Sequence, residues 1–139
     1  MQNQLFQMNQ YNNLNIGKLI DINKALQNNK QSEAVELILD KKIEDFETII
    51  TWQFVVDTIS DYSKWLTWLN NNYKPLFNYI EEEYMTDIDK FYEKWNWYAI
   101  LFENFCDGDY FKMDEAFKIN VIAFFNHLTY LHEKNNLKI

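Results

Sequence analysis

The sequence lacks arginine altogether, and its 139 residues include only 2 Gly, 1 Pro and 1 Cys. Collagen-like and disulfide-stapled chains need far more Gly, Pro or Cys, so both classes are excluded. Sheet proteins with many tight turns also depend on Gly, Pro or Asn-Gly pairs. Because 47% of the residues are hydrophobic, a wholly disordered chain is excluded too. We therefore expect an all-α fold of a length that suits one domain.

The absence of arginine also narrows the function. All 13 basic residues are lysines, and 21 acidic residues leave a formal net charge of −8. Arginine is the usual residue for bidentate recognition of phosphate and guanine, and neutralisation of the phosphate backbone dominates affinity for nucleic acid. We expect no direct, sequence-specific binding to nucleic acid. The same negative charge disfavours binding to an anionic membrane.

Residues with catalytic or metal-binding chemistry form no recognisable constellation. Cys106 stands alone, so zinc sites built on several cysteines are excluded. His127 and His132 are five residues apart, which separates them by about 140° on a helix and prevents them from sharing a metal ion. The acids that follow Cys106 lack the spacing of a calcium-binding helix–loop–helix motif. We expect no catalytic residues, no metal and no cofactor.

Segments that would direct the chain out of the cytoplasm are not apparent. The N-terminus has neither the basic flank nor the apolar run of a signal peptide. The uncharged stretch 119–130 is too short to span a bilayer, and a single cysteine suits a reducing compartment. We expect a cytoplasmic protein, in the host cell if a phage encodes it.

The chain divides into a polar start and one helical body. Residues 1–15 contain nine Gln or Asn and little apolar periodicity, which predicts a mobile polar N-terminal arm. Residues 16–139 contain no linker and no repeat, which predicts a single helical domain. The predicted fold is a bundle of five to six helices with an aromatic-rich core.

Apolar residues in the body recur every three or four positions, the period of an α-helix. Ser32 is a plausible N-cap, and Thr86 followed by Asp89 resembles a capping box. Pro75 suits the first turn of a helix. The pattern predicts helices over 16–28, from 32 to about 42, and over 43–70, 74–84, 87–106 and 113–135.

The fifth of these segments is expected to be the central helix of the bundle. Phe91, Trp95, Tyr98, Phe102 and Phe105 form one apolar stripe along it. Two further apolar residues, Trp97 and Leu101, lie off this stripe. The stripe predicts a face packed in the core.

Negative charge is concentrated in the middle of the chain. Residues 31–111 hold 17 acids and 6 lysines, whereas the segments on either side are slightly basic. Carboxylates spaced along a helix lie several ångströms apart, comparable with phosphates on a nucleic-acid strand. Such a surface could dock in a basic channel that normally holds nucleic acid. The plainer interpretation is a solvated face that keeps an aromatic-rich domain in solution.

Aromatic residues are also in excess, with 5 Trp, 9 Tyr and 11 Phe. Most must fill the core, but Trp and Tyr within a polar rim are typical anchors of protein interfaces. The densest mixture of acids and rings lies in one short stretch. The candidate partner-binding residues are Glu81, Glu82, Glu83, Tyr84, Asp87, Asp89, Tyr92, Glu93 and Trp97.

Charge, interleaved rings and the lack of a catalytic constellation together predict a binding protein and not an enzyme. In size and composition the chain resembles phage-encoded antagonists of host defence, such as anti-CRISPR proteins and nucleic-acid mimics that block restriction. The resemblance implies a small acidic inhibitor or regulator from a phage or mobile element. Its partner would be a larger basic protein, a nucleic-acid-processing effector or its nucleoprotein complex.

Three alternatives remain open from the sequence. An immunity protein could use the same acidic surface to neutralise a basic nuclease toxin. A small-ligand-binding helical domain or enzyme could hold an aromatic pocket, with Glu103, Asp107, His127 or Cys106 at its mouth. A homo-oligomer could bury its surplus rings against a symmetry mate.

Overall fold

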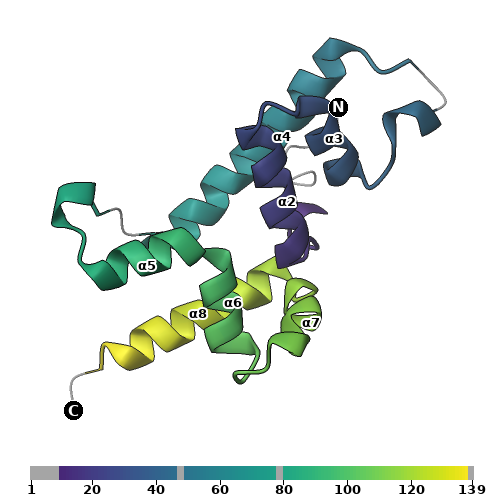
Figure 1. The fold of residues 1–139 in the computed structure, drawn as a ribbon. Helices are drawn as coiled ribbons and strands as arrows, with labels where there is room; N and C mark the ends of the chain where they lie inside the picture. Colours follow the sequence, from purple (N-terminus) through teal and green to yellow (C-terminus); the bar gives the residue numbers. More distant parts are fainter. Residues whose placement is uncertain (1–9, 47–48, 78–79, 138–139) are drawn as a thin grey trace.

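The computed structural model describes residues 10–46, 49–77 and 80–137, and it confirms the predicted all-α class for a single domain. Seven α-helices lie within the described residues: α2 (Ile16–Gln27), α3 (Gln31–Leu39), α4 (Trp52–Asn72), α5 (Asp87–Trp95), α6 (Trp97–Phe105), α7 (Met113–Phe117) and α8 (Val121–Asn135). Four 3-10 turns join them: η1 (Ile43–Asp45), η2 (Lys74–Leu76), η3 (Glu82–Tyr84) and η4 (Tyr110–Lys112). Figure 1 shows the path of the chain.

One connected core lies around α2. This helix packs against α3, α7 and α8, and α3 packs in turn against the long helix α4. The largest fully buried side chains are aromatic and come from two distant parts of the chain, α4 and α8: Tyr62, Trp65, Phe124 and Phe125. Buried aromatic side chains contribute about 2–3 kcal/mol each through the area they remove from water. The predicted aromatic-rich core is therefore present.

The end of the predicted N-terminal arm is packed against this core. Residues 1–9 lie outside the described residues, so the prediction stays open there. Residues 10–15, in contrast, contact the domain. The Tyr11 ring centroid lies 5.6 Å from that of Trp65, and Asn12 Oδ1 accepts a 2.8 Å hydrogen bond from Trp65 Nε1. Burial raises the pKa of Tyr11 to about 12. Glutamine and asparagine dominate the composition here, but the Tyr11 ring and hydrogen bonds from the Asn120 side chain and the Val121 amide to the carbonyl oxygens of Asn12 and Leu14 hold the segment against the domain.

Two predicted helices are each divided at an asparagine. Segment 87–106 breaks at Asn96, whose backbone adopts φ 44° and ψ −116° between α5 and α6. Segment 113–135 breaks before α8. There the Asn120 side chain accepts hydrogen bonds from the amides of Ile122 and Ala123, which makes Asn120 the N-cap.

Other predicted helix ends are corrected by capping side chains. Within the segment predicted as a helix over 43–70, α4 begins at Trp52, where Thr51 Oγ1 accepts a 3.1 Å hydrogen bond from the Phe54 amide and caps the helix, and residues 43–45 form the 3-10 turn η1. Ser32 is not an N-cap, since α3 begins one residue earlier without a side-chain cap. The helix predicted over 74–84 reduces to the 3-10 turns η2 and η3 within the described residues.

Asn96 is strained, and its replacement by glycine should stabilise the protein. A side chain at φ 44° and ψ −116° is outside the regions that L-residues normally occupy, at a cost of about 1–3 kcal/mol. We expect Asn96→Gly to raise the free energy of unfolding by about 1 kcal/mol, after the entropy cost of glycine. Urea denaturation measures this. Asn96→Ala is the control and should not stabilise; equal effects of both variants would contradict the strain.

Candidate protein-binding site

Eight of the nine predicted partner-binding residues lie on a projection formed by residues 81–95, which we call the α5 projection. It comprises η3 and α5, and Figure 1 shows it extending away from α2, α3 and α4. No residue of η3 or α5 is buried. The helix packs mainly against α6. Its surface is therefore available to solvent along most of its length.

Local hydrogen bonds hold α5 in place. The predicted capping box is confirmed: the Asp89 amide donates to Thr86 Oγ1 (3.2 Å), and the Thr86 amide donates to Asp89 Oδ2 (3.0 Å). Towards the other end, Tyr92 Oη donates a 2.9 Å hydrogen bond to Glu103 Oε1 on α6. That hydrogen bond is the main cause of the raised pKa of Tyr92. Both ends of the short helix are thus fixed without a core contact.

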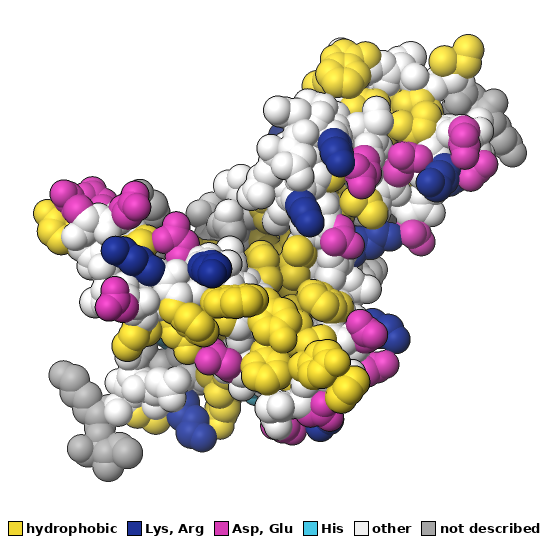
Figure 2. Space-filling view, in the orientation of Figure 1, with side chains coloured by type: hydrophobic (Ala, Val, Ile, Leu, Met, Phe, Trp, Pro, Cys, Tyr) yellow, Lys and Arg dark blue, Asp and Glu magenta, His cyan; other side chains and the backbone are white. Residues whose placement is uncertain are grey.

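The acidic residues gather at the far end of the projection. Glu81, Glu82, Glu83 and Asp87 are exposed, and no salt bridge among the described residues involves any of them. We call these four residues the acidic tip. Figure 2 shows their end of the molecule as a group of acidic side chains, with lysines further along the helix. Segment 81–97 contains six acids and two lysines, a net charge of −4.

The other candidate residues have different surroundings. Asp89 is half-buried and its carboxylate serves the capping box, whereas Glu93 is exposed on α5. Tyr84 is 72% exposed beside the acidic tip, and Tyr92 is exposed but binds Glu103. The structure therefore brings eight of the nine candidates together on the α5 projection. One of these eight, Asp89, already has a structural role.

Trp97 is the candidate that lies elsewhere. It begins α6 and is half-buried, with its ring centroid 5.9 Å from that of Phe124 and 6.2 Å from that of Phe125. It thus packs on the core and not on the projection. Leu101, one turn further along, is fully buried. Trp97 and Leu101, which lie off the predicted apolar stripe, are therefore on the side of α6 that faces the core.

The predicted core stripe is, conversely, largely open to solvent. Phe91, Trp95 and Tyr98 are 52%, 46% and 44% exposed, and Phe102 is half-buried. Successive ring centroids are 6.5, 5.7 and 5.9 Å apart, so the rings contact one another across the break at Asn96. We call these four side chains the ring row. The expectation of a central helix is wrong, because α5 leaves the body of the molecule.

Hydrophobic side chains are visible over α6 and the adjoining end of α5 in Figure 2, and acidic side chains lie beyond them. The ring row was missed as a binding surface because helical periodicity shows that residues share a face but not what covers it. The one available signal was the position of the row directly after an acid-rich stretch.

The residues proposed for an aromatic ligand pocket do not converge. Cys106 is buried with its Sγ 3.5 Å from Met113 Sδ, and burial raises the pKa of its thiol. His127 is exposed and its ring lies 5.1 Å from that of Phe105. Glu103 binds Tyr92, and Asp107 lies 3.9 Å from a lysine ammonium group. None of the four lines the three cavities described for this structure.

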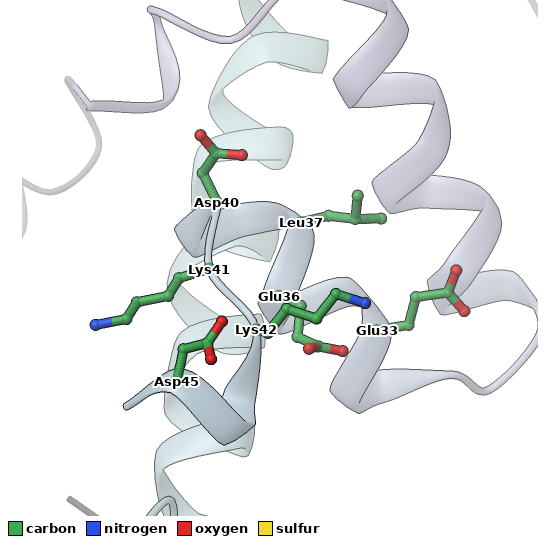
Figure 3. Close-up of a pocket in the computed structure, with 7 residues that line it drawn as sticks. All are labelled: Glu33, Glu36, Leu37, Asp40, Lys41, Lys42 and Asp45. Carbon is green, nitrogen blue, oxygen red and sulfur yellow. The ribbon is translucent and has the colours of Figure 1, made fainter. Parts of the chain in front are cut away.

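The largest of these cavities is a charged hollow of about 490 Å³ beside the end of α3. Figure 3 shows its seven lining residues: Glu33, Glu36, Leu37, Asp40, Lys41, Lys42 and Asp45. Asp40 pairs with Lys18 at 2.7 Å, which lowers the pKa of the carboxyl, and Glu36 accepts a hydrogen bond from the Ile43 amide. Lys41 points away from the hollow in Figure 3. The charged side chains that line the hollow are thus largely paired within the protein.

A second cavity of about 480 Å³ lies between the end of α4, η2 and α8, with Tyr73, Leu76 and His132 among its lining residues. Tyr73 Oη donates to Asn126 and His132 Nε2 lies 3.2 Å from Asn136 Nδ2, so these polar groups have partners inside the protein. Across the described parts of the chain, no group of three or more His, Cys, Asp or Glu is arranged to hold a metal ion.

Comparison with known proteins gives no family model, no curated protein and no solved structure that matches this chain. Within the ranges described above, no helix is both long and apolar enough to cross a membrane. Fold and site together define a single-domain, all-α protein that exposes an acidic and aromatic projection.

Proposed function

We propose that this protein is a small acidic inhibitor or regulator that docks on a larger basic protein through the α5 projection. The observation that carries the proposal is the acidic tip: four exposed carboxylates, without salt bridges among the described residues, at the end of a projection whose turn η3 and helix α5 have no buried residue. A solvated face that served only solubility would not require a capped helix to present it.

Electrostatics favours a basic groove as the docking surface. A net charge of −4 on the projection attracts a positively charged channel over a distance of about one Debye length, roughly 8–10 Å at physiological salt. Channels that bind nucleic acid are positively charged, and they also accommodate flat aromatic rings. Occupying one would block the natural ligand. The partner would be a nucleic-acid-processing effector or its nucleoprotein complex.

Within this class, an anti-CRISPR-like antagonist of host defence from a phage or mobile element is the function that we propose. The small size and the acidic projection support it. Its place of action would be the cytoplasm of the host cell. An immunity protein that neutralises a basic nuclease toxin would use the same acidic tip. An adjacent toxin gene would favour immunity, and a cluster of anti-defence genes would favour the antagonist.

Charge reversal at the acidic tip tests the proposal. We expect Glu81→Lys, Glu82→Lys and Glu83→Lys together to weaken binding at least tenfold, because each substitution replaces attraction with repulsion in a complementary interface. The salt dependence of binding should fall as well. The assay is affinity capture from host extract by the wild-type chain, followed by titration of the retained, identified protein against both forms.

The matched control reverses three exposed acids elsewhere, Glu44, Asp45 and Asp57, for the same change in net charge. This control should retain most of the affinity. Equal loss in both triple variants would show that overall charge governs binding, and unchanged binding of the tip variant would remove the proposed docking mode.

A further inference from the structure

The ring row leads from the core of the molecule to the acidic tip. Its inner member, Phe102, is half-buried and packs against the core cluster, and Phe105 on the same helix stacks on the buried Phe124 with ring centroids 5.0 Å apart. Exposure then rises outwards through Phe102, Tyr98 and Trp95 to Phe91. The row is therefore an outward extension of the core that nothing among the described residues covers.

The rings of the row contact one another in a continuous line across the break at Asn96, with successive ring centroids 5.7–6.5 Å apart. Phe91 and Trp95 are four residues apart on α5, and Tyr98 and Phe102 are four residues apart on α6, so each pair lies on one face of its own helix. Ile88, three residues before Phe91, is exposed on the same face of α5. Such a row matches the apolar stripe of another helix laid alongside it.

The helix that carries the outer part of the row is held ready for binding. A nine-residue helix is marginal in water on its own, and α5 has no buried residue to stabilise it. The capping box at Thr86 and the Tyr92–Glu103 hydrogen bond supply that stabilisation locally. Because the helix is already formed, a partner loses little affinity to ordering it.

A second copy of this chain is a poor occupant of the row. Two projections of net charge −4 repel each other, and each whole chain carries −8. The exposed portions of the rings amount to roughly 300 Å², taking 150–250 Å² as the full contribution of an aromatic side chain. A stable dimer needs about 800 Å² on each partner. The row therefore calls for an oppositely charged partner that also covers the tip.

We propose that the ring row receives an amphipathic helix of the partner protein, whose apolar stripe packs along the row and whose lysine- or arginine-rich end lies against the acidic tip. This inference rests on the proposed function and adds the structural class of the recognised element. The tip fixes the direction of the bound helix, because only one orientation places its basic end beside Glu81, Glu82 and Glu83.

A defined peptide pair tests the inference with the full chain. The first probe is a synthetic, labelled 18-residue helical peptide with leucines at seam positions and three lysines at one end, and the second has glutamates in place of those lysines. Fluorescence anisotropy measures binding. We expect the lysine peptide to bind at least tenfold more tightly than the glutamate peptide. The variant Phe91→Ser with Trp95→Ser should lose at least tenfold in affinity for the lysine peptide.

The matched control is Trp52→Ala, an exposed ring at the start of α4 and outside the projection, which should leave peptide binding unchanged. Equal affinities for the two peptides would overturn the inference, as would a double variant that binds like the wild type. A wild-type dimer that the double variant converts to a monomer would also overturn it. If tip reversal still abolishes capture of the host protein, the proposed function stands while this inference fails.

Discussion

Replacement of Trp65 by alanine is expected to lower the free energy of unfolding by about 3–5 kcal/mol, one of the two largest losses that we predict. The Trp65 side chain is fully buried on α4, and its ring contacts those of Tyr11 and Tyr62. Alanine would leave a cavity the size of an indole ring. It would also leave Asn12 Oδ1 without its donor.

Trp68 provides the matched control because it lies on the same helix, three residues further on, and is exposed. We expect Trp68→Ala to cost less than about 1 kcal/mol, as for most substitutions outside the core. Urea denaturation followed by circular dichroism compares the two variants. Similar losses would mean that α4 does not present the Trp65 face to the core.

Part of this fold could be predicted from the sequence alone. Local signals identified the helical class and several ends correctly: Thr86 with Asp89 caps α5 as expected, and α2 occupies almost the predicted range. These features depend on side chains that bond within a few residues of themselves. Such information is present in any short window of the sequence.

Features that depend on contacts between distant residues were not predictable in this way. Nothing in a polar segment rich in Gln and Asn shows that the Tyr11 ring will contact that of a tryptophan 54 positions away. Asn96 tolerates a positive φ better than most residues do, but many of the chain's asparagines sit in regular helix. The residue type alone therefore does not mark the break between α5 and α6.

In the candidate site, too, local features were predictable from the sequence and features that depend on distant contacts were not. The acidic residues of the tip lie close together in the sequence, so the tip could be located without the structure. The sequence prediction placed Trp97 on the partner-binding surface and the ring row in the core. Both depended on which side of α6 meets the core, and α6 buries the side that carries Trp97 and Leu101. Trp97 packs against the α8 aromatics and Leu101 is buried in the core, whereas the row continues outwards onto α5.

The resulting arrangement separates stability from binding. The side chains that hold the domain together come from α2, α4, α6, α7 and α8, and α5 contributes none of the buried core. Substitutions on α5 should therefore alter binding without unfolding the protein. This separation makes the tip and the row accessible to mutational tests that a core site would not allow.

The second large effect is expected at Gly17, where α2 and α7 approach closely. A Cβ atom at this position would lie 3.0 Å from both the Cβ and the carbonyl oxygen of Phe117. In an exposed helix, alanine would stabilise by about 1 kcal/mol relative to glycine. Here we expect Gly17→Ala to destabilise by about 1–3 kcal/mol and Gly17→Leu by more, because the backbone of α7 must move.

Gly108 is a glycine for a different reason: its backbone has a left-handed conformation, but there is room for a side chain. Its φ is +76°, and an added Cβ would meet no atom within 4 Å. Asparagine tolerates left-handed backbone, so Gly108→Asn should cost less than about 1 kcal/mol, whereas Gly17→Asn should be as damaging as Gly17→Leu. Thermal and urea unfolding of the four variants distinguish the two causes. A stabilised Gly17→Ala variant would show that α2 and α7 do not pack at the distance described, and the core around α2 would need a different arrangement.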